Sequence, residues 1–239
     1  MALLSVIIVV YNEHSTVEEV IRKVEAVSID GMEKEILIVD DCSTDGTRDV
    51  LKKYEDCYEI TYHPKNTGKG GAVRTGFSKA KGDYIIVQDA DVEQNPQDFD
   101  SLLRPILIGM ADVVFGSRFA GQYLPDSMVM SLHFKINRFF TVFSNLLTGY
   151  LTTDMWTGYK MYSRKAIDTI LPHLTSDGIE IEPEVTILLS KFGFRVVDVP
   201  ITYFPRWYDE GKKTNWKQAV RSLVKMIAFA CRKIPGAKH

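Results

Sequence analysis

Acidic side chains gather at three places in the sequence, and each place follows directly on a run of apolar residues. The clusters are Tyr11-Asn12-Glu13, residues 40–46 and residues 89–93. In a sheet with helices on both faces, ligands bind beyond the carboxyl ends of the strands, so the clusters are expected to share one edge. Each cluster alone also fits helix capping and turn formation. Together they predict a ligand site.

The third cluster favours a divalent cation. Asp89, Asp91 and Glu93 alternate after an apolar run, and an extended backbone would point all three carboxylates to one side. Hard oxygen ligands suit Mg²⁺ or Mn²⁺, and Mg²⁺ held by carboxylates commonly also binds substrate phosphates. A second Asp-x-Asp, Asp98-Phe99-Asp100, stands at a predicted helix start and carries no such expectation. The alternating pattern predicts a metal-bound nucleoside diphosphate.

A glycine-rich stretch, residues 65–71 (KNTGKGG), invites comparison with phosphate-binding loops. It matches neither the Walker pattern nor the dinucleotide fingerprint, which disfavours kinases, ATPases and dehydrogenases. Lys69 and Arg74 stand near a predicted helix N-terminus, where an anion would be favoured. Binding an anion and merely turning the chain both remain open for this stretch.

The elements that would position these residues alternate along the chain. Apolar, β-branched runs predict strands at residues 5–10, 36–39, 59–62, 84–87 and 112–116. Helical spacing predicts helices at residues 17–27, 45–54, 71–80 and 98–108. Strands that alternate with helices indicate an α/β protein with a mostly parallel sheet.

Composition and charge narrow the class further. The chain has 239 residues, of which 45% are hydrophobic and 25% charged, which is typical of a globular protein and excludes collagen-like and disordered classes. Its apolar runs are far shorter than the roughly 18 residues that cross a bilayer, and its start lacks a basic signal-peptide region, so a cytoplasmic location is expected. Cys42, Cys57 and Cys231 are scattered, which disfavours a zinc site or disulfide framework.

Positive charge is concentrated at the C-terminus. The net charge is −2, yet residues 205–239 hold 9 Lys/Arg and 2 Asp/Glu, a local balance of +7. Residues 216–227 place apolar side chains on one helical face and basic ones on another. A wide apolar face in place of a continuous basic stripe disfavours nucleic acid as the partner.

Ordered motifs give the chain a family resemblance. Residues 4–213 resemble the family 2 glycosyltransferases through residues 6–13 (VIIVVYNE), 38–47 (IVDDCSTDGT), 66–76, 88–93 (QDADVE) and 116–118 (GSR). The chain is most similar there to polyprenyl-phosphate sugar synthases of the dolichol-phosphate mannose synthase type, through residues 157–160 (TGYK) and 206–213 (RWYDEGKK). The resemblance implies a glycosyltransferase A-type fold, a Rossmann-like, mostly parallel sheet flanked by helices, with a catalytic domain at residues 1–213.

The resemblance also implies residue roles and a divalent metal, Mg²⁺ or Mn²⁺. The donor would be bound by Tyr11, Glu13, Asp40, Asp41, Asn66, Lys69 and Asp89. The metal ligands would be Asp89, Asp91 and Glu93. The catalytic set that stabilises the leaving diphosphate would be Asp91, Arg118, Arg206 and Lys212. Val9 and Cys42 stand where the family commonly has Pro and Gly.

The implied reaction is metal-dependent transfer of a hexose from a nucleotide diphosphate sugar to a polyprenyl (dolichyl) phosphate. Such a phosphate is already anionic near pH 7, so no general base is required. The alternative acceptor, a sugar hydroxyl of a glycan or glycolipid, needs a base, for which the candidates are Asp154, Glu180, Glu182 and Glu184. The three glutamates also fit a helix start, where the helix dipole favours carboxylates. The sugar, the base and the oligomeric state stay open.

Two further interpretations concern partners. A nucleotide-sugar-binding protein without transferase activity is the alternative from another class, and the intact set of carboxylates and cations disfavours it. Residues 136–151 and 216–234 have the composition of helices that lie in a membrane interface, although ordinary core packing competes for the first. Residues 214–239 are expected to form a basic amphipathic helix on the cytoplasmic face of a membrane.

Overall fold

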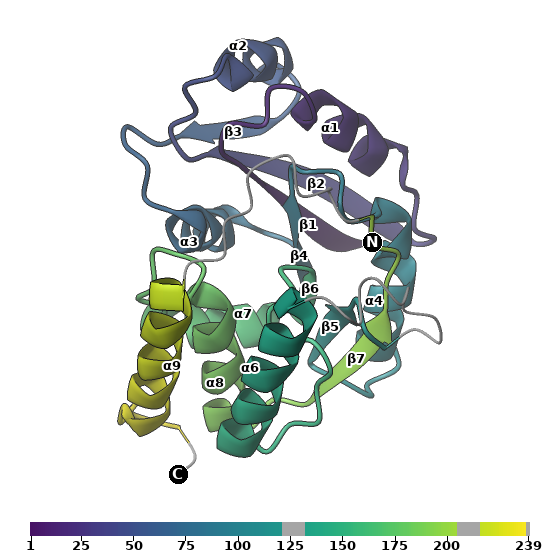
Figure 1. Ribbon diagram of the computed structural model, residues 1–239. Helices are drawn as coiled ribbons and strands as arrows, with labels where there is room; N and C mark the ends of the chain where they lie inside the picture. The colour runs from purple at the N-terminus through teal and green to yellow at the C-terminus, as the bar shows by residue number, and fades with distance from the viewer. Residues whose placement is uncertain (121–131, 205–215, 238–239) are drawn as a thin grey trace.

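The computed structural model describes residues 1–120, 132–204 and 216–237, without the side chains of residues 132–133 and 216–220. Its strands form one seven-stranded sheet in the order β3-β2-β1-β4-β6-β5-β7 (Figure 1). The strands are β1 (Ala2–Val10), β2 (Met32–Asp40), β3 (Glu59–Tyr62), β4 (Tyr84–Asp89), β5 (Val113–Ser117), β6 (Lys160–Ser163) and β7 (Val196–Pro200).

Helices connect the strands. The α-helices are α1 (Val17–Ala26), α2 (Thr47–Leu51), α3 (Lys69–Lys79), α4 (Phe99–Leu107), α6 (Leu132–Thr148), α7 (Arg164–Ile170), α8 (Ile181–Phe192) and α9 (Trp216–Cys231). Short 3₁₀ turns, η1 (Lys52–Tyr54), η2 (Pro96–Asp98) and η3 (Leu171–His173), extend or precede three of them.

The sheet is mostly parallel, as the sequence predicts. Strands β1 to β4 pair in parallel, and so do β5 and β7. Strand β6 is antiparallel to both of its neighbours, β4 and β5. The five predicted strands correspond to β1 to β5, whereas β6, β7 and α7 were not predicted. The parallel strands bring the ends of β1, β2 and β4 to one edge.

Each face of the sheet has its own hydrophobic core, because successive strand residues point to opposite sides. On one face, Val6 and Ile8 of β1 pack with α1, α2 and α4. On the other, Ile7 and Val9 pack with α3, α7 and α8. Two such layers fix the sheet edge from both sides, so the loops that follow the strands start from rigid positions.

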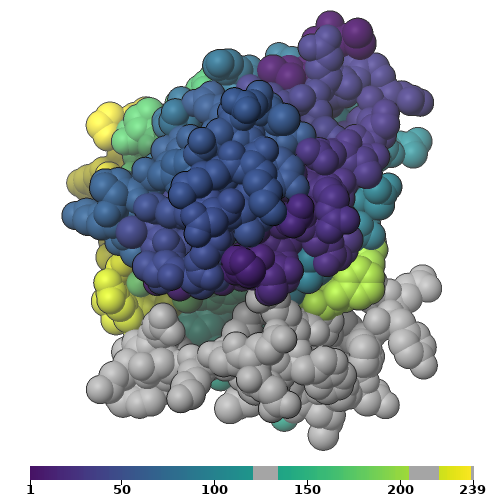
Figure 2. All heavy atoms as spheres, turned by 90° about the horizontal axis from the view of Figure 1, so that it is seen from above, coloured from purple at the N-terminus to yellow at the C-terminus, as the bar shows by residue number. Residues whose placement is uncertain are grey.

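The C-terminal helix packs against the rest of the protein. Met226 of α9 is fully buried in a cluster with Phe140 of α6, Ile187 of α8 and Met155, which precedes β6. Helix α9 lies beside α8 in Figure 1. Seen from above in Figure 2, the N-terminal part of the chain, in purple and blue, fills the upper part of the view, and C-terminal residues in yellow lie at the left edge. In the described ranges, none of the helices has the length and apolar character needed to cross a membrane.

Candidate active site

A cleft of about 720 Å³ opens where β1, β2, β4 and β5 end. Nine of the residues that the sequence singled out line it: Tyr11, Glu13, Asp41, Asn66, Lys69, Asp89, Asp91, Glu93 and Arg118. They come from segments more than 100 residues apart along the chain, and the sheet brings them together. Predicted Asp40 does not line the cleft, and Arg206 and Lys212 lie outside the described residues.

Asp41 is bound by the glycine-rich segment. Its Oδ1 accepts hydrogen bonds from the backbone N–H and hydroxyl of Thr67, at 2.8 and 2.7 Å, and lies 2.7 Å from Nδ1 of His63. Its Oδ2 accepts from the N–H of Gly68 at 2.7 Å. Burial alone would raise the pKa of Asp41, but the bonds from Thr67, His63 and Gly68 outweigh it and lower that pKa. Asp41 is therefore held ionised at the cleft wall.

The glycine-rich stretch binds a carboxylate of the chain itself, and binding of a ligand anion there stays a prediction. The residues just before α3 do meet an anion, and that anion is the chain's own Asp41 carboxylate. Gly70 serves packing, because a Cβ there would lie 2.3 Å from the carbonyl oxygen of Ser176. The stretch thus both turns the chain and binds a carboxylate, and it brings Lys69 to the cleft.

We expect Asp41→Asn to destabilise the fold by about 1 to 3 kcal/mol at about pH 7, because buried N–H donors lose a charged acceptor. The folded-state pKa lies below the unfolded value of about 3.9, so this stabilisation is present above that value and is lost as the pH falls through the folded-state pKa. Urea unfolding at about pH 7 and about pH 3 should show the difference between variant and wild type shrinking in acid. An equal difference at both pH values would contradict the assignment, and the exposed Asp49→Asn is the control.

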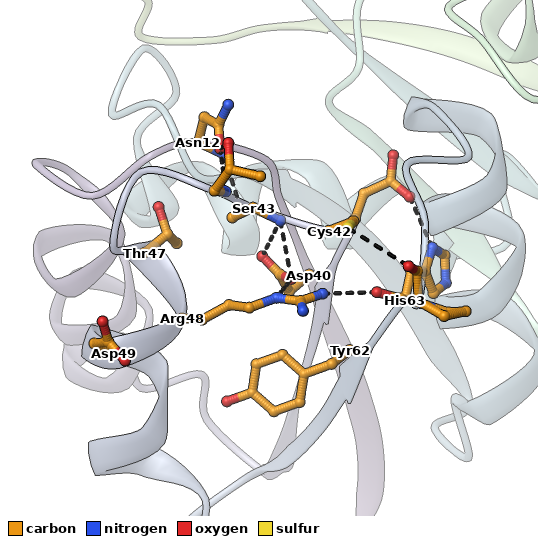
Figure 3. Close-up of polar contacts among 12 residues, drawn as sticks. Asn12, Asp40, Cys42, Ser43, Thr47, Arg48, Asp49, Tyr62 and His63 are labelled. Carbon is orange, nitrogen blue, oxygen red and sulfur yellow. Dashed lines mark hydrogen bonds and ion pairs between the residues drawn. The ribbon is translucent and has the colours of Figure 1, made fainter.

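Asp40 supports the loop from below and does not face the cleft. Its carboxylate is fully buried, 2.6 Å from Nε of Arg48, and it accepts the N–H of Ser43. Figure 3 shows Arg48 reaching from α2 to Asp40 and to the backbone oxygen of His63, with Tyr62 beneath it. Donor binding by Asp40 stays a prediction. Its position makes it an anchor for the loop that carries Asp41.

Backbone strain collects at the same edge. Asn12, Cys42 and Val92 have φ of +54°, +67° and +54°, and they are the non-glycine residues with positive φ in the described ranges. They follow β1, β2 and β4. Such conformations cost about 1 to 3 kcal/mol each and cluster at functional sites. Cys42 stands where a glycine is common, and its φ is one that glycine adopts without strain.

The turn after β4 overturns the predicted alternation of carboxylates. The strand ends at Asp89 and Val92 has a positive φ, so the backbone from Asp89 to Glu93 is not the extended one that the alternation assumes. Glu93 is buried and accepts a hydrogen bond from Tyr203 at 2.7 Å, while Asp91 accepts the N–H of Glu93 at 3.2 Å. Across the described parts of the chain, no three acidic, His or Cys side chains converge to hold a metal. The metal site of Asp89, Asp91 and Glu93 therefore stays a prediction, and all three residues line the cleft.

Asp89 takes part in a chain of alternating charges. Nζ of Lys69 lies 2.9 Å from both carboxylate oxygens of Asp89 and 3.5 Å from Oε1 of Glu182. The other oxygen of Glu182 binds Lys160, which is fully buried over the ring of Phe115. Burial alone would lower the pKa of Lys69, but Asp89 and Glu182 outweigh it and raise that pKa. Lys69 therefore stays charged within the cleft.

Arg118 is oriented by a carboxylate from another segment. Nε and Nη2 lie 2.7 and 2.8 Å from the two oxygens of Asp154, which is fully buried. The guanidinium also lies 5.3 Å from the ring centre of Tyr203. A bidentate pair of this kind fixes the plane of the arginine. The positive group is thus fixed at the cleft wall, where it would meet an anionic ligand.

The four proposed bases are each engaged elsewhere. Asp154 binds Arg118, and Glu182 binds two lysines. Glu180 lies 3.2 Å from Lys225 of α9, and Glu184 accepts bonds from the backbone of Thr175 and Ser176. Glu182 and Glu184 lie in the first turn of α8, as the helix-start interpretation predicted.

Sequence reasoning missed several residues that shape the cleft. Gln94 is buried and donates to Asp89 at 3.3 Å, and an isolated bridge pairs its backbone with that of Tyr203. Lys160 and Gly158 belong to a segment that carries the resemblance, but the sequence predicts no role for either. A Cβ at Gly158 would lie 2.5 Å from Nζ of Lys69, so this glycine makes room for the Lys69–Asp89 pair. Only the position of Gly158 within its short motif could have pointed to it.

Comparisons with known proteins agree with this architecture. The sequence model described as "Glycosyl transferase family 2" matches residues 5–171. An uncharacterized protein of Methanocaldococcus jannaschii is 30% identical over 93% of this chain and 90% of its own length. The UDP-N-acetylglucosamine--dolichyl-phosphate N-acetylglucosaminyltransferase of Methanococcus voltae is 28% identical over 97% of this chain and 98% of its own.

Solved structures share the fold. The crystal structure of glucosyl-3-phosphoglycerate synthase from Mycobacterium tuberculosis, in complex with Mn²⁺, UDP and glucosyl-3-phosphoglycerate, superposes with a TM-score of 0.71. It is 20% identical and covers 96% of this chain and 80% of that chain. The family model covers well over half of the present sequence, and a relative at 30% identity covers nearly all of it. The chain therefore belongs to glycosyl transferase family 2 and is a glycosyltransferase with a glycosyltransferase A-type fold.

Proposed function

We propose that the chain transfers a hexose from a nucleotide diphosphate sugar to a polyprenyl phosphate such as dolichyl phosphate, with the help of a divalent cation. The observation that carries the proposal is the cleft, which places ionised Asp41 and exposed Tyr11 beside Lys69, Asp91 and Arg118. A nucleoside with a diphosphate needs this combination of hydrogen-bond acceptors, an aromatic surface and cations.

The donor is the better supported of the two substrates. Arg118 is fixed by Asp154, so its charge would be preorganised for a diphosphate that gains negative charge as it leaves. The Mycobacterium tuberculosis enzyme with the same fold is described in complex with UDP and Mn²⁺. Tyr11 is 49% exposed, which suits a side chain that packs against a bound nucleoside.

The acceptor argument rests on the four candidate bases. A sugar hydroxyl needs a base within hydrogen-bond reach, and Asp154, Glu180, Glu182 and Glu184 each bind a cation or backbone N–H groups. A phosphate is already anionic near pH 7 and attacks without one. The name of the Methanococcus voltae relative specifies a dolichyl-phosphate acceptor. Both observations favour a lipid phosphate over a glycan hydroxyl.

The described residues suit a metal site that substrate phosphates complete, and not one made of protein ligands alone. Asp91 and Asp89 both line the cleft, and Asp89 lies 2.9 Å from Nζ of Lys69. Mg²⁺ is usually held by one or two carboxylates together with substrate phosphates. Asp91 would hold Mg²⁺ or Mn²⁺ in this way, and the cation would neutralise charge on the leaving diphosphate.

Helix α6 supports a membrane surface as partner. Its Phe139, Val142 and Leu146 are exposed at helical spacing, whereas Phe140 of the same helix is buried. Lys135 and Arg138 are exposed beside them. Apolar side chains flanked by basic ones are typical of helices that lie in an anionic lipid interface. We therefore place the protein at the periphery of a membrane, where a polyprenyl phosphate would be found.

The function is tested in two stages. Thermal unfolding with UDP- and GDP-sugars, with and without Mn²⁺, should show a metal-dependent stabilisation by one donor, about 2.7 kcal/mol at 100 times its dissociation constant. That donor, radiolabelled, is then incubated with the protein and liposomes that contain a short polyprenyl phosphate. Liposomes with the corresponding polyprenol are the matched control, since only the phosphate differs. We expect labelled lipid in the first sample alone.

Two results would contradict the proposal. Stabilisation by none of the donors would remove the nucleotide-sugar assignment. Transfer to glycan hydroxyls with no label in the polyprenyl phosphate would establish the alternative acceptor, and a carboxylate would then have to leave its present partner to act as base.

A further inference from the structure

Lys69 lies between two carboxylates, one closer to its ammonium group than the other. Its Nζ is 2.9 Å from each oxygen of Asp89 and 3.5 Å from Oε1 of Glu182. Asp89 lines the cleft beside Asp91, while Glu182 belongs to the first turn of α8. The lysine thus holds the cleft-facing carboxylate closely and has a second acceptor within a small movement.

Glu182 already has another cation. Lys160 binds its Oε2 and is fully buried, where it also donates to the carbonyl oxygens of Met155 and Thr157. Four charges therefore alternate from the cleft inward, in the order Asp89, Lys69, Glu182 and Lys160, and their sum is zero. A divalent cation that approached Asp89 alone would meet the positive charge of Lys69 at hydrogen-bond distance from that carboxylate. Repulsion at such a distance is strong in a partly buried site.

The surrounding backbone is shaped to hold the pair. At Gly158, a Cβ would lie 2.5 Å from Nζ of Lys69 and 2.9 Å from Oδ2 of Asp89. Gln94 donates to the same Oδ2 at 3.3 Å. The pair thus sits in a fitted space on the cleft wall, and it is not a chance contact between two mobile surface side chains.

We propose that Lys69 is a resident cation that holds Asp89 while the donor is absent and passes to Glu182 when a divalent cation arrives with the donor diphosphate. The inference rests on the proposed function, which supplies the diphosphate. The proposal predicts that the divalent cation and the nucleotide bind together and that the cation does not bind first. The metal alone binds weakly because Lys69 occupies Asp89, and the metal with nucleotide binds well because the diphosphate compensates both cations.

The experiment measures Mn²⁺ binding to ligand-free protein by electron paramagnetic resonance of the free ion. Lys69→Met removes the charge and keeps an unbranched side chain, so Mn²⁺ alone should bind about tenfold more tightly or better than to wild type. Lys69→Arg keeps the charge and should bind Mn²⁺ as weakly as wild type. The matched control is Lys79→Met at the far end of α3, where the lysine pairs with Glu59 on the surface.

A double variant tests whether the gain in Mn²⁺ affinity comes from Asp89. Adding Asp89→Asn to Lys69→Met should abolish the gain, because the freed carboxylate is its source. Mn²⁺ affinity unchanged in Lys69→Met, or a gain that survives Asp89→Asn, would overturn the proposal. Lys69→Gln replaces Lys69→Met where circular dichroism shows that the methionine variant is not folded.

The proposed function is judged by a separate arm of the same experiment. Wild-type protein with UDP or GDP should take up more Mn²⁺ than the sum of the amounts bound by the protein alone and by the nucleotide alone, because the nucleotides themselves bind Mn²⁺. Failure of this arm would count against the nucleotide donor and against the release step of Lys69. The comparison of Lys69→Met with wild type contains no nucleotide, so it tests the hold of Lys69 on Asp89 whatever the nucleotide arm shows.

Discussion

Replacing Asp91 by asparagine is expected to lower the rate of sugar transfer about 10²- to 10³-fold while the fold stays intact. The rate falls because the substitution removes one negative charge from the wall of the cleft, where a cation and a diphosphate would meet. Losing a single preorganised electrostatic group commonly has an effect of this size on the chemical step. Initial rates at saturating donor and fixed Mn²⁺ measure it.

The fold should tolerate this change. Oδ1 of Asp91 accepts the N–H of Glu93 at 3.2 Å, and the amide oxygen of asparagine can accept the same bond. We expect the free energy of unfolding to change by less than about 0.5 kcal/mol, as for most substitutions away from the core.

The chain offers a matched control in its second Asp-x-Asp. Asp100 is exposed in the first turn of α4 and is not among the residues that line the cleft. Asp100→Asn makes the same chemical change and should leave the transfer rate at the wild-type value. A rate for Asp91→Asn above about a tenth of wild type would show that this carboxylate does not hold the cation.

The fold could be predicted from the sequence where the signal is local. Strands β1, β2 and β4 each contain an uninterrupted apolar run, and such runs indicate strands buried on both faces. Strand β6 spans four residues that begin with a charged one, Lys160, and it pairs antiparallel with β4 and β5. Its place in the sheet depends on contacts with strands about 45 to 80 residues away. The residue types of Lys160–Ser163 do not predict these contacts.

The site, too, was predictable in part: the sequence predicted its members but not their partners. The order of polar clusters after the strands predicted which residues would meet, because parallel strands end at one edge. Partner choice could not be predicted, since an ion pair depends on tertiary distances. The pairing of Asp89 with Lys69 and of Arg118 with Asp154 therefore came only from the structure. The bend at Val92 was also missed, because a β-branched residue rarely takes a positive φ.

Lys160 shows why burial of a charge escapes sequence reasoning. Lysine is among the residues least often fully buried, yet this side chain is 0% exposed. Its ammonium group binds Glu182 and two backbone carbonyl oxygens, and it lies 4.7 Å from the ring centre of Phe115. Burial lowers the pKa of Lys160, and the opposing effect of Glu182 does not fully offset it.

Lys160→Met is expected to destabilise the protein by about 3 to 5 kcal/mol, the usual result of removing one partner from a buried ion pair. Methionine fills nearly the same space, so the loss comes from unpaired polar groups and not from a cavity. Urea unfolding followed by circular dichroism measures it. Lys165→Met, at an exposed lysine of α7, should stay within about 0.5 kcal/mol of wild type.

A double variant separates the ion pair from packing. Glu182→Gln added to Lys160→Met removes the carboxylate that the single variant leaves uncompensated, so the pair should be less destabilised than the sum of its members by about 1 to 3 kcal/mol. Lys69 limits this coupling, because it stays 3.5 Å from Glu182 and can move toward it. Additive effects would mean that Lys160 acts through its bonds to Met155 and Thr157 alone. A loss below about 1 kcal/mol in Lys160→Met would show that the inner half of the charge chain is dispensable for the fold.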